Sequence, residues 1–109
     1  MTMMTHFAIT ADTQIVASKN QVSCELAGEV AILNLKNSNY YGLDPVGARV
    51  WRLIQNRSMI GAVRDVIVAE YDVDVAQADR DVIELISELA AEGLVDIVGS
   101  DSDSSQRLS

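Results

Sequence analysis

The amino-acid sequence predicts a mixed α+β domain in which a three-stranded antiparallel meander is followed by three helices. Residues 21–26 alternate between polar and apolar side chains, residues 29–35 form an apolar run, and helical apolar patterns follow Asp44. Consecutive strands joined by short turns form a meander, and strands that precede the helices rather than alternate with them are typical of α+β folds. A chain of 109 residues is long enough to bury one core without disulfides or metal ions.

Composition and charge exclude several classes of site. Cys24 and His6 are the only cysteine and the only histidine, which excludes an intrachain disulfide and a zinc site built from such ligands. The formal net charge of -8 disfavours a nucleic-acid partner. Residues 1–7 lack the basic and apolar regions of a signal peptide, and no apolar run approaches the roughly 20 residues of a membrane span. We therefore expect a cytoplasmic protein without membrane contact.

The start of the chain is expected to contribute little to the core. Residues 1–20 contain few apolar side chains and no sustained period, so we expect a partly flexible N-terminal arm that holds one short strand at most. The first strand of the meander is expected at residues 21–26, with Val22, Cys24 and Leu26 on its buried face. Cys24 is then a small buried residue rather than a nucleophile, because no histidine lies where it could activate the thiol.

The second and third strands follow at short intervals. Ala27 and Gly28 form a two-residue hairpin signal, after which the second strand is expected at residues 29–35. Both faces of this strand are apolar, so it is either covered on both sides or lines a surface that something else covers. A polar turn at residues 36–39 leads to a short third strand at residues 40–43. This strand is expected at the sheet edge, where its unpaired backbone groups could pair with another chain.

Three helices are expected after the meander. Asp44 is a good N-cap and Pro45 suits the first helical position, so the first helix is placed at residues 45–56. A second amphipathic helix follows and ends before Asp74. Asp74 is expected to cap the third helix, which Gly93 ends by taking the left-handed position.

The third helix has a wide apolar surface. Its main stripe consists of Ala78, Val82, Leu85, Ile86 and Leu89. Ile83 and Ala90 widen that stripe on one flank. Either the helix is buried over more of its surface, or Ile83 and Ile86 line a groove.

The end of the chain completes a recognisable pattern. Residues 94–98 are expected to add a short strand and residues 99–109 to form a disordered tail, which leaves residues 21–98 as the folded domain. Strands, three helices and a terminal wing are the pattern of a winged helix-turn-helix domain, whose third helix enters the DNA major groove. Here that helix has Arg80 as its one base, against the acids Asp79, Asp81, Glu84, Glu88 and Glu92. Phosphates would repel it, so the commonest function of the architecture is disfavoured.

Several short motifs resemble the PqqD-like family. They are Gly28–Leu35, Tyr40–Asp44, Val46–Ala48, Val50–Trp51, Tyr71–Val73, Asp81–Val82, and Leu89 with Gly93–Val95. Members of this family, also called RiPP recognition elements, are small winged-helix domains that bind the leader segment of ribosomally made precursor peptides. The resemblance covers roughly residues 22–98 and is greatest to the stand-alone leader-binding proteins of lasso-peptide pathways.

The resemblance implies a non-catalytic domain, without cofactor or metal, that binds a leader peptide as an added strand and presents it to the processing enzymes. The implied partners are a leader peptidase and a cyclase of the same pathway. The peptide would pair with the third strand and pack against the third helix, which accounts for the free sheet edge and the wide apolar flank. The implied peptide-binding residues are Asn39, Tyr40, Tyr41, Gly42, Leu43, Val82, Ile83 and Ile86.

The sequence leaves two questions open. It does not decide which of Tyr40 and Tyr41 faces the groove, because this depends on the pleat of the third strand. It also allows a function of another class, an acidic winged-helix transcriptional regulator or protein–protein adaptor. An enzyme ranks third, because no base, nucleophile or metal constellation is present in the sequence.

Overall fold

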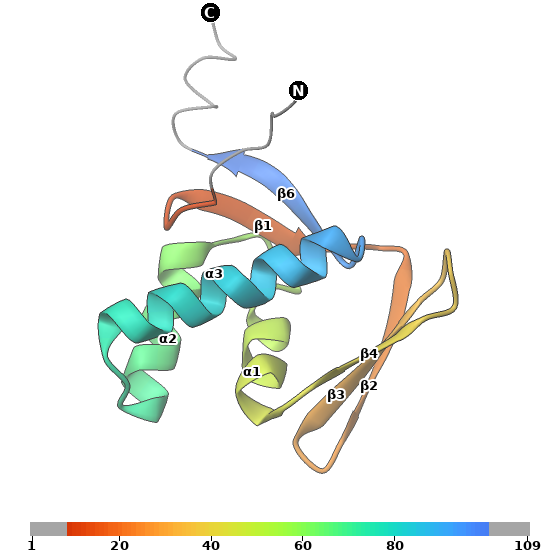
Figure 1. Ribbon diagram of the computed structural model, residues 1–109, viewed down its shortest axis with the longest axis horizontal. Coiled ribbons are helices and arrows are strands. Elements are labelled where there is room, and N and C mark those ends of the chain that lie inside the picture. The colour runs from red at the N-terminus through yellow and green to blue at the C-terminus, as the bar shows by residue number, and fades with distance from the viewer. Residues whose placement is uncertain (1–8, 101–109) are drawn as a thin grey trace, which may run out of the picture.

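The computed structural model describes residues 9–100, which form two three-stranded antiparallel sheets and three helices (Figure 1). The elements in chain order are β1 (Thr13–Ala17), β2 (Gln21–Leu26), β3 (Glu29–Asn34), β4 (Tyr40–Leu43), α1 (Pro45–Leu53), β5 (Ser58–Met59), α2 (Ile60–Tyr71), α3 (Val75–Ala91) and β6 (Val95–Ser100). The mixed α+β architecture predicted from the sequence is confirmed. Figure 1 shows the strands β1 and β6 above the helices and the sheet of β2, β3 and β4 at their side.

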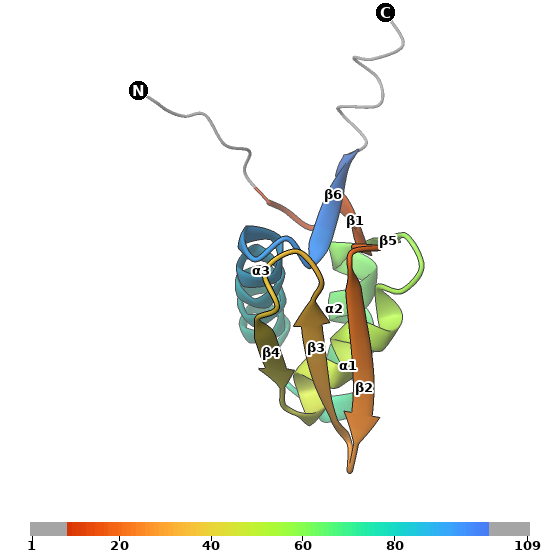
Figure 2. The same cartoon turned by 90° about the vertical axis from the view of Figure 1, so that its right-hand side faces the viewer.

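The predicted meander is the sheet β2-β3-β4, in which β4 is an edge strand (Figure 2). Its inner face is apolar, because Val30, Ile32 and Leu43 are all at most 5% exposed. These side chains pack against a core that the helices complete. The indole of Trp51 on α1 belongs to this core and is 2% exposed. Figure 2 shows β4 on the side of the sheet nearest α3 and β2 on the far side.

The predicted orientation of β2 is wrong. Val22 is 55% exposed and Leu26 is 76% exposed, and Cys24 between them is exposed as well. The face that meets α1 is the polar one, since the Ser23 hydroxyl accepts a hydrogen bond from Trp51 Nε1 at 3.2 Å. A period of two separates the faces of a strand but does not say which face a helix covers. Here the indole of Trp51 fills the space between α1 and β2, and the small side chain of Ser23 contacts it.

The other sheet has the order β5-β1-β6 and includes part of the predicted arm. Ile15 on β1 is fully buried. After the end of β1, the Ser18 N–H donates a hydrogen bond to the Leu94 C=O at 2.9 Å, so this segment stays attached to the folded domain. Residues on both sides of the boundary predicted at residue 20 therefore pack into the same folded domain. The predicted final strand is confirmed as β6, which extends into the first residues of the predicted tail. Residues 1–8 of the arm and 101–109 of the tail lie outside the described residues.

The predicted helix caps are confirmed. The Asp44 carboxylate accepts from Gly47 N–H at 2.8 Å, and the Asp74 carboxylate accepts from Gln77 N–H at 3.2 Å. Gly93 follows α3 with φ +76, a left-handed conformation that costs glycine little. Helix α1 ends at Leu53, earlier than expected. Within residues 9–100, no helix combines the length and the apolar content that crossing a membrane requires.

Candidate functional site

The edge strand β4 offers backbone groups for pairing, because its only neighbour in the described sheet is β3. The Asn34 N–H donates to the Asn39 C=O at 2.8 Å, and this bond sets the phase of the antiparallel ladder. Two residues along, Tyr41 directs its N–H and C=O towards β3. Tyr40 and Gly42 alternate with it and direct theirs to the free edge. Those two residues are where an added strand would form hydrogen bonds.

The pleat of β4 settles which tyrosine faces the helix. The side chain of Tyr40 is 76% exposed on the outer face of the sheet. The side chain of Tyr41 is half-buried on the inner face, and its hydroxyl donates a hydrogen bond to the Glu88 carboxylate on α3. This bond, together with burial and the negative charges of Glu88 and Glu92, raises the pKa of Tyr41 to about 12. Tyr41 is therefore a neutral hydrogen-bond donor at physiological pH.

A second polar contact fastens the β3–β4 turn to the end of α3. Asn34 is 5% exposed, and its side-chain Nδ2 donates to the Glu92 C=O at 2.7 Å. Its Oδ1 accepts from the Lys36 N–H at 2.8 Å. Both polar atoms of this buried amide are thus satisfied, as burial requires. The Asn34 and Tyr41 contacts hold β4 at a fixed position beside the C-terminal half of α3.

Next to these contacts lies an apolar cavity of about 560 Å³, partly open to solvent, between β4, α1, the end of α2 and α3. Its lining residues are Tyr41, Gly42, Leu43, Asp44, Val46, Gly47, Val50, Ile67, Tyr71, Val73, Ala78, Asp81, Val82 and Leu85. Val46 and Tyr71 are 39% and 40% exposed, which is high for large apolar side chains. The cavity can take apolar side chains of a partner whose backbone pairs with β4.

The structure brings most of the predicted peptide-binding residues to this place. Tyr41, Gly42, Leu43 and Val82 line the cavity. Tyr40 is on the exposed outer face of the same strand, and the exposed Asn39 immediately precedes it. The strand β4 and one residue of α3 are thus placed together as the sequence led us to expect.

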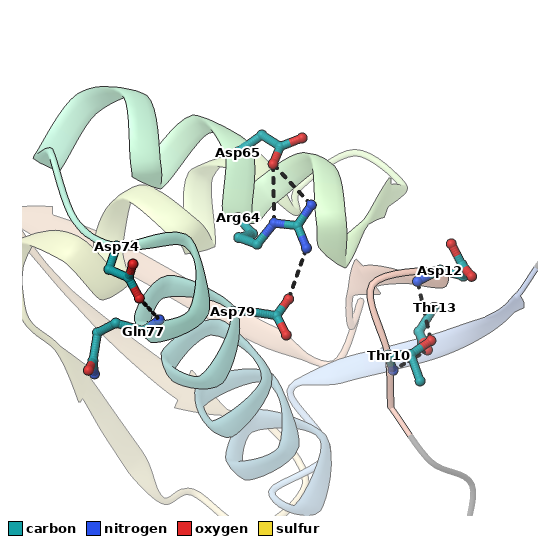
Figure 3. A network of polar contacts seen from close by, with 8 residues as sticks. All are labelled: Thr10, Asp12, Thr13, Arg64, Asp65, Asp74, Gln77 and Asp79. Carbon is teal, nitrogen blue, oxygen red and sulfur yellow. Dashed lines mark hydrogen bonds and ion pairs between the residues drawn. The ribbon is translucent and has the colours of Figure 1, made fainter.

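Ile83 and Ile86 are not brought to the cavity. Ile86 is fully buried, and the half-buried Ile83 packs against the hydrophobic core. Ile83 follows Asp79 by one helical turn and so lies on the flank of α3 that is turned to α2. Figure 3 shows Arg64 of α2 reaching that flank, where its guanidinium forms an ion pair with Asp79 at 3.1 Å.

The sequence reasoning missed three residues of α3 that line the cavity, namely Ala78, Asp81 and Leu85. Leu85 was assigned to the core stripe, and Asp81 to an acidic surface. The sequence holds no signal that identifies this flank, because Asp79 and Ile83 repeat the same spacing of a carboxylate and an aliphatic residue on the flank turned to α2.

The site contains the elements of peptide recognition. Among residues 9–100, no group of three or more histidine, cysteine, aspartate or glutamate side chains could hold a metal ion. What the site does offer is a line of unpaired backbone groups on β4 beside an apolar cavity. Such a combination binds an extended segment, whose backbone supplies hydrogen bonds and whose alternate side chains enter the cavity.

Comparisons with known proteins agree with this geometry. The family model described as "Coenzyme PQQ synthesis protein D (PqqD)" matches residues 29–95. The solved structure "TbiB1 in Complex with the TbiA(beta) Leader Peptide" is 34% identical, covers 74% of this chain and 94% of its own, and has a TM-score of 0.70. A "Lasso peptide synthetase B1 complexed with the leader peptide" is similar in fold, with 17% identity, coverage of 75% and 96%, and a TM-score of 0.68. No curated protein sequence matches the chain.

Proposed function

Because the chain belongs to the PqqD family, we propose that it binds the leader segment of a ribosomally made precursor peptide in lasso-peptide biosynthesis. The unpaired edge of β4 beside an apolar cavity is the observation that carries this proposal. The likeness to TbiB1, whose structure contains a leader peptide, supports it independently of the geometry.

The proposed mode of binding is β-augmentation on β4. The N–H and C=O groups of Tyr40 and Gly42 pair with the leader backbone, and Asn39 and Leu43 flank them. Inward-facing leader side chains enter the cavity. Tyr41, Val82 and Leu85 then form its walls. In this proposal Ile86 supports the cavity from within the core, and Ile83 makes no contact with the peptide.

We also propose that the protein is a non-catalytic, cytoplasmic partner that presents the leader to a peptidase and a cyclase. The order α1, α2, α3 and β6 supports a winged helix-turn-helix classification of the fold. The acidity of α3 disfavours the regulatory role common to that fold. Its exposed carboxylates, such as Glu84 and Glu88, would meet DNA phosphates with like charge.

The backbone part of the proposal is tested by titrating the protein with a synthetic leader peptide that it binds. Two versions of the peptide are made, one with N-methyl groups on the amides of odd-numbered residues and one with them on the amides of even-numbered residues. In an added strand, only the amides of alternate residues donate hydrogen bonds to β4. We therefore expect one version to lose at least about 30-fold in affinity and the other less than about threefold. Equal affinities of the two versions would contradict β-augmentation.

The cavity part is tested with Leu85→Asn, which replaces an apolar wall by an amide of similar size. Truncation of a central contact typically costs about 2 kcal/mol, so we expect the Kd for the leader to rise about 30-fold. The matched control is Ser87→Asn on the exposed face of the same helix, which should change the Kd by less than about twofold. Normal binding by folded Leu85→Asn protein would place the peptide elsewhere.

A further inference from the structure

Four carboxylates surround the groove between β4 and α3. Asp44 and Asp81 line the cavity itself. Glu88 accepts the hydrogen bond from the Tyr41 hydroxyl, and the charge of Glu92 also acts on that phenol. No lysine or arginine lines the cavity. The site that the leader would enter is therefore negative along its length.

The arginines of the described chain form their ion pairs away from this groove. Among residues 9–100, the ion pairs are Arg49–Glu70, Arg52–Glu25, Arg64–Asp65 and Arg64–Asp79. None of them includes a groove carboxylate. The partners of the groove carboxylates are instead neutral. Asp81 accepts from the Gln77 side-chain amide at 3.0 Å, and Asp44 accepts from a backbone N–H.

Two of the four carboxylates lie at the C-terminal end of α3. Glu88 lies in the last turn and Glu92 is the C-cap, and no basic residue is present in that turn. The partial negative charge of the helix C-terminus adds to both carboxylates, and the two are one turn apart, so they repel each other. This arrangement is unfavourable for the free protein. A bound cation would relieve it.

From this charge distribution we infer that the protein selects leader segments with a lysine or arginine next to the apolar anchor, so that the cation meets Glu88 and Glu92. The inference rests on the proposed leader binding and adds the chemical class of the leader. Leu85 and Glu92 are about 10 Å apart along the helix axis, and alternate strand residues are about 6.7 Å apart. A long cationic side chain two or four positions from the anchor would therefore reach the carboxylates.

The test uses a displayed library of random 12-residue peptides, selected on the 109-residue chain. We expect enriched peptides to carry more lysine and arginine than aspartate and glutamate, at even spacing from an apolar residue. A synthetic copy of one enriched peptide is then titrated with the protein and with the Glu88→Gln/Glu92→Gln variant. Each solvated ion pair contributes about 1.4-fold to fivefold in affinity, so we expect the double variant to bind about threefold to tenfold more weakly.

A control variant with the same change of charge is Glu29→Gln/Asp96→Asn, since both residues are exposed and neither lines the cavity. It should bind within about twofold of the unmodified protein. Enriched peptides that depend on Leu85 but lack a cationic excess, and bind the Glu88/Glu92 variant normally, would overturn the inference and leave leader binding intact. Enriched peptides that are indifferent to Leu85→Asn, or no enrichment, would overturn the proposed function and the inference with it.

Discussion

Helix α3 has two flanks beside its buried stripe, and they have opposite surroundings. On the flank turned to α2, Asp79 is held in an ion pair by Arg64 (Figure 3). Ile83 packs against the core one turn later. On the flank turned to β4, Asp81 and Leu85 have the same spacing. Leu85 also packs against the core, but both residues line an open cavity. The same pattern of a carboxylate and an aliphatic residue thus occurs once in a closed interface and once in a groove.

The state of the carboxylate distinguishes the two flanks. A partly buried carboxylate is costly unless a cation pairs with it, and Arg64 supplies that cation to Asp79, whose side chain is 35% exposed. Asp81 is exposed and needs no such partner, so it accepts only neutral donors from Gln77. The flanks differ because α2 packs over the first, whereas on the second only the end of α2 borders the open cavity.

The largest expected difference between the flanks concerns stability. Ile83→Asn places an amide against the core in a closed interface, so we expect the free energy of unfolding to fall by about 2 kcal/mol or more. Leu85 also packs against the core, but its replacement can turn the amide into the open cavity, so Leu85→Asn should cost less, about 1 kcal/mol. Urea unfolding followed by circular dichroism measures both. Equal losses would show that the cavity is closed in solution.

The meander, the edge position of β4 and the caps Asp44 and Asp74 could be predicted because each depends on local chemistry. Strand alternation, N-cap carboxylates and a glycine after a helix act within a few residues of the chain. The position of β4 beside the cavity was expected for the same reason, with the added likeness to a known family, and its role in peptide binding stays a prediction.

The features that could not be predicted from the sequence depend on which helix or strand, distant along the chain, packs against a given face of a strand or helix. The alternation in β2 is clear, but the indole of Trp51 meets the Ser23 side and leaves Leu26 outside. Likewise, Ile83 and Leu85 are both apolar, half-buried and packed against the core, and only the position of the neighbouring elements decides that Leu85 also lines the cavity. The core strand β1 has too few residues to show a period, and its pairing with β6 joins opposite ends of the described chain.

An effect of intermediate size is expected on the pKa of Tyr41, whose hydroxyl donates a hydrogen bond to Glu88 and so connects β4 to α3. Because the hydrogen bond to Glu88 raises the pKa of Tyr41 to about 12, the phenol should ionise well above its usual pKa near 10. Ultraviolet difference titration of the protein against Tyr41→Phe isolates this group. In Glu88→Gln the pKa of Tyr41 should fall towards the usual value. An unchanged pKa in that variant would mean that the Glu88 contact is not formed in solution.

This shift also sets the direction of a pH effect on stability. The folded state holds the Tyr41 proton more tightly than the unfolded state, so the contribution of this contact is fully present below about pH 10. It is lost as the pH rises from about 10 to about 12, where the unfolded chain releases the proton first. Tyr41→Phe should therefore lose less stability across this alkaline window than the unmodified protein does.

The smallest expected effect is the difference in stability when the same substitution, aspartate to asparagine, is made on each flank of α3. Asp79→Asn removes the charge that pairs with Arg64, whose side chain is only 23% exposed, so we expect a loss of about 0.5 to 1 kcal/mol. Asp81→Asn removes the same charge where no cation is paired, and should change the free energy of unfolding by less than about 0.3 kcal/mol. A double-mutant cycle with Arg64→Met assigns the loss at Asp79 to the ion pair if the coupling energy accounts for most of it. High salt should weaken that coupling only partly, because the pair is partly shielded from solvent. A loss at Asp81 as large as that at Asp79 would mean that the two carboxylates have equivalent surroundings, and the distinction between a closed and an open flank would fail.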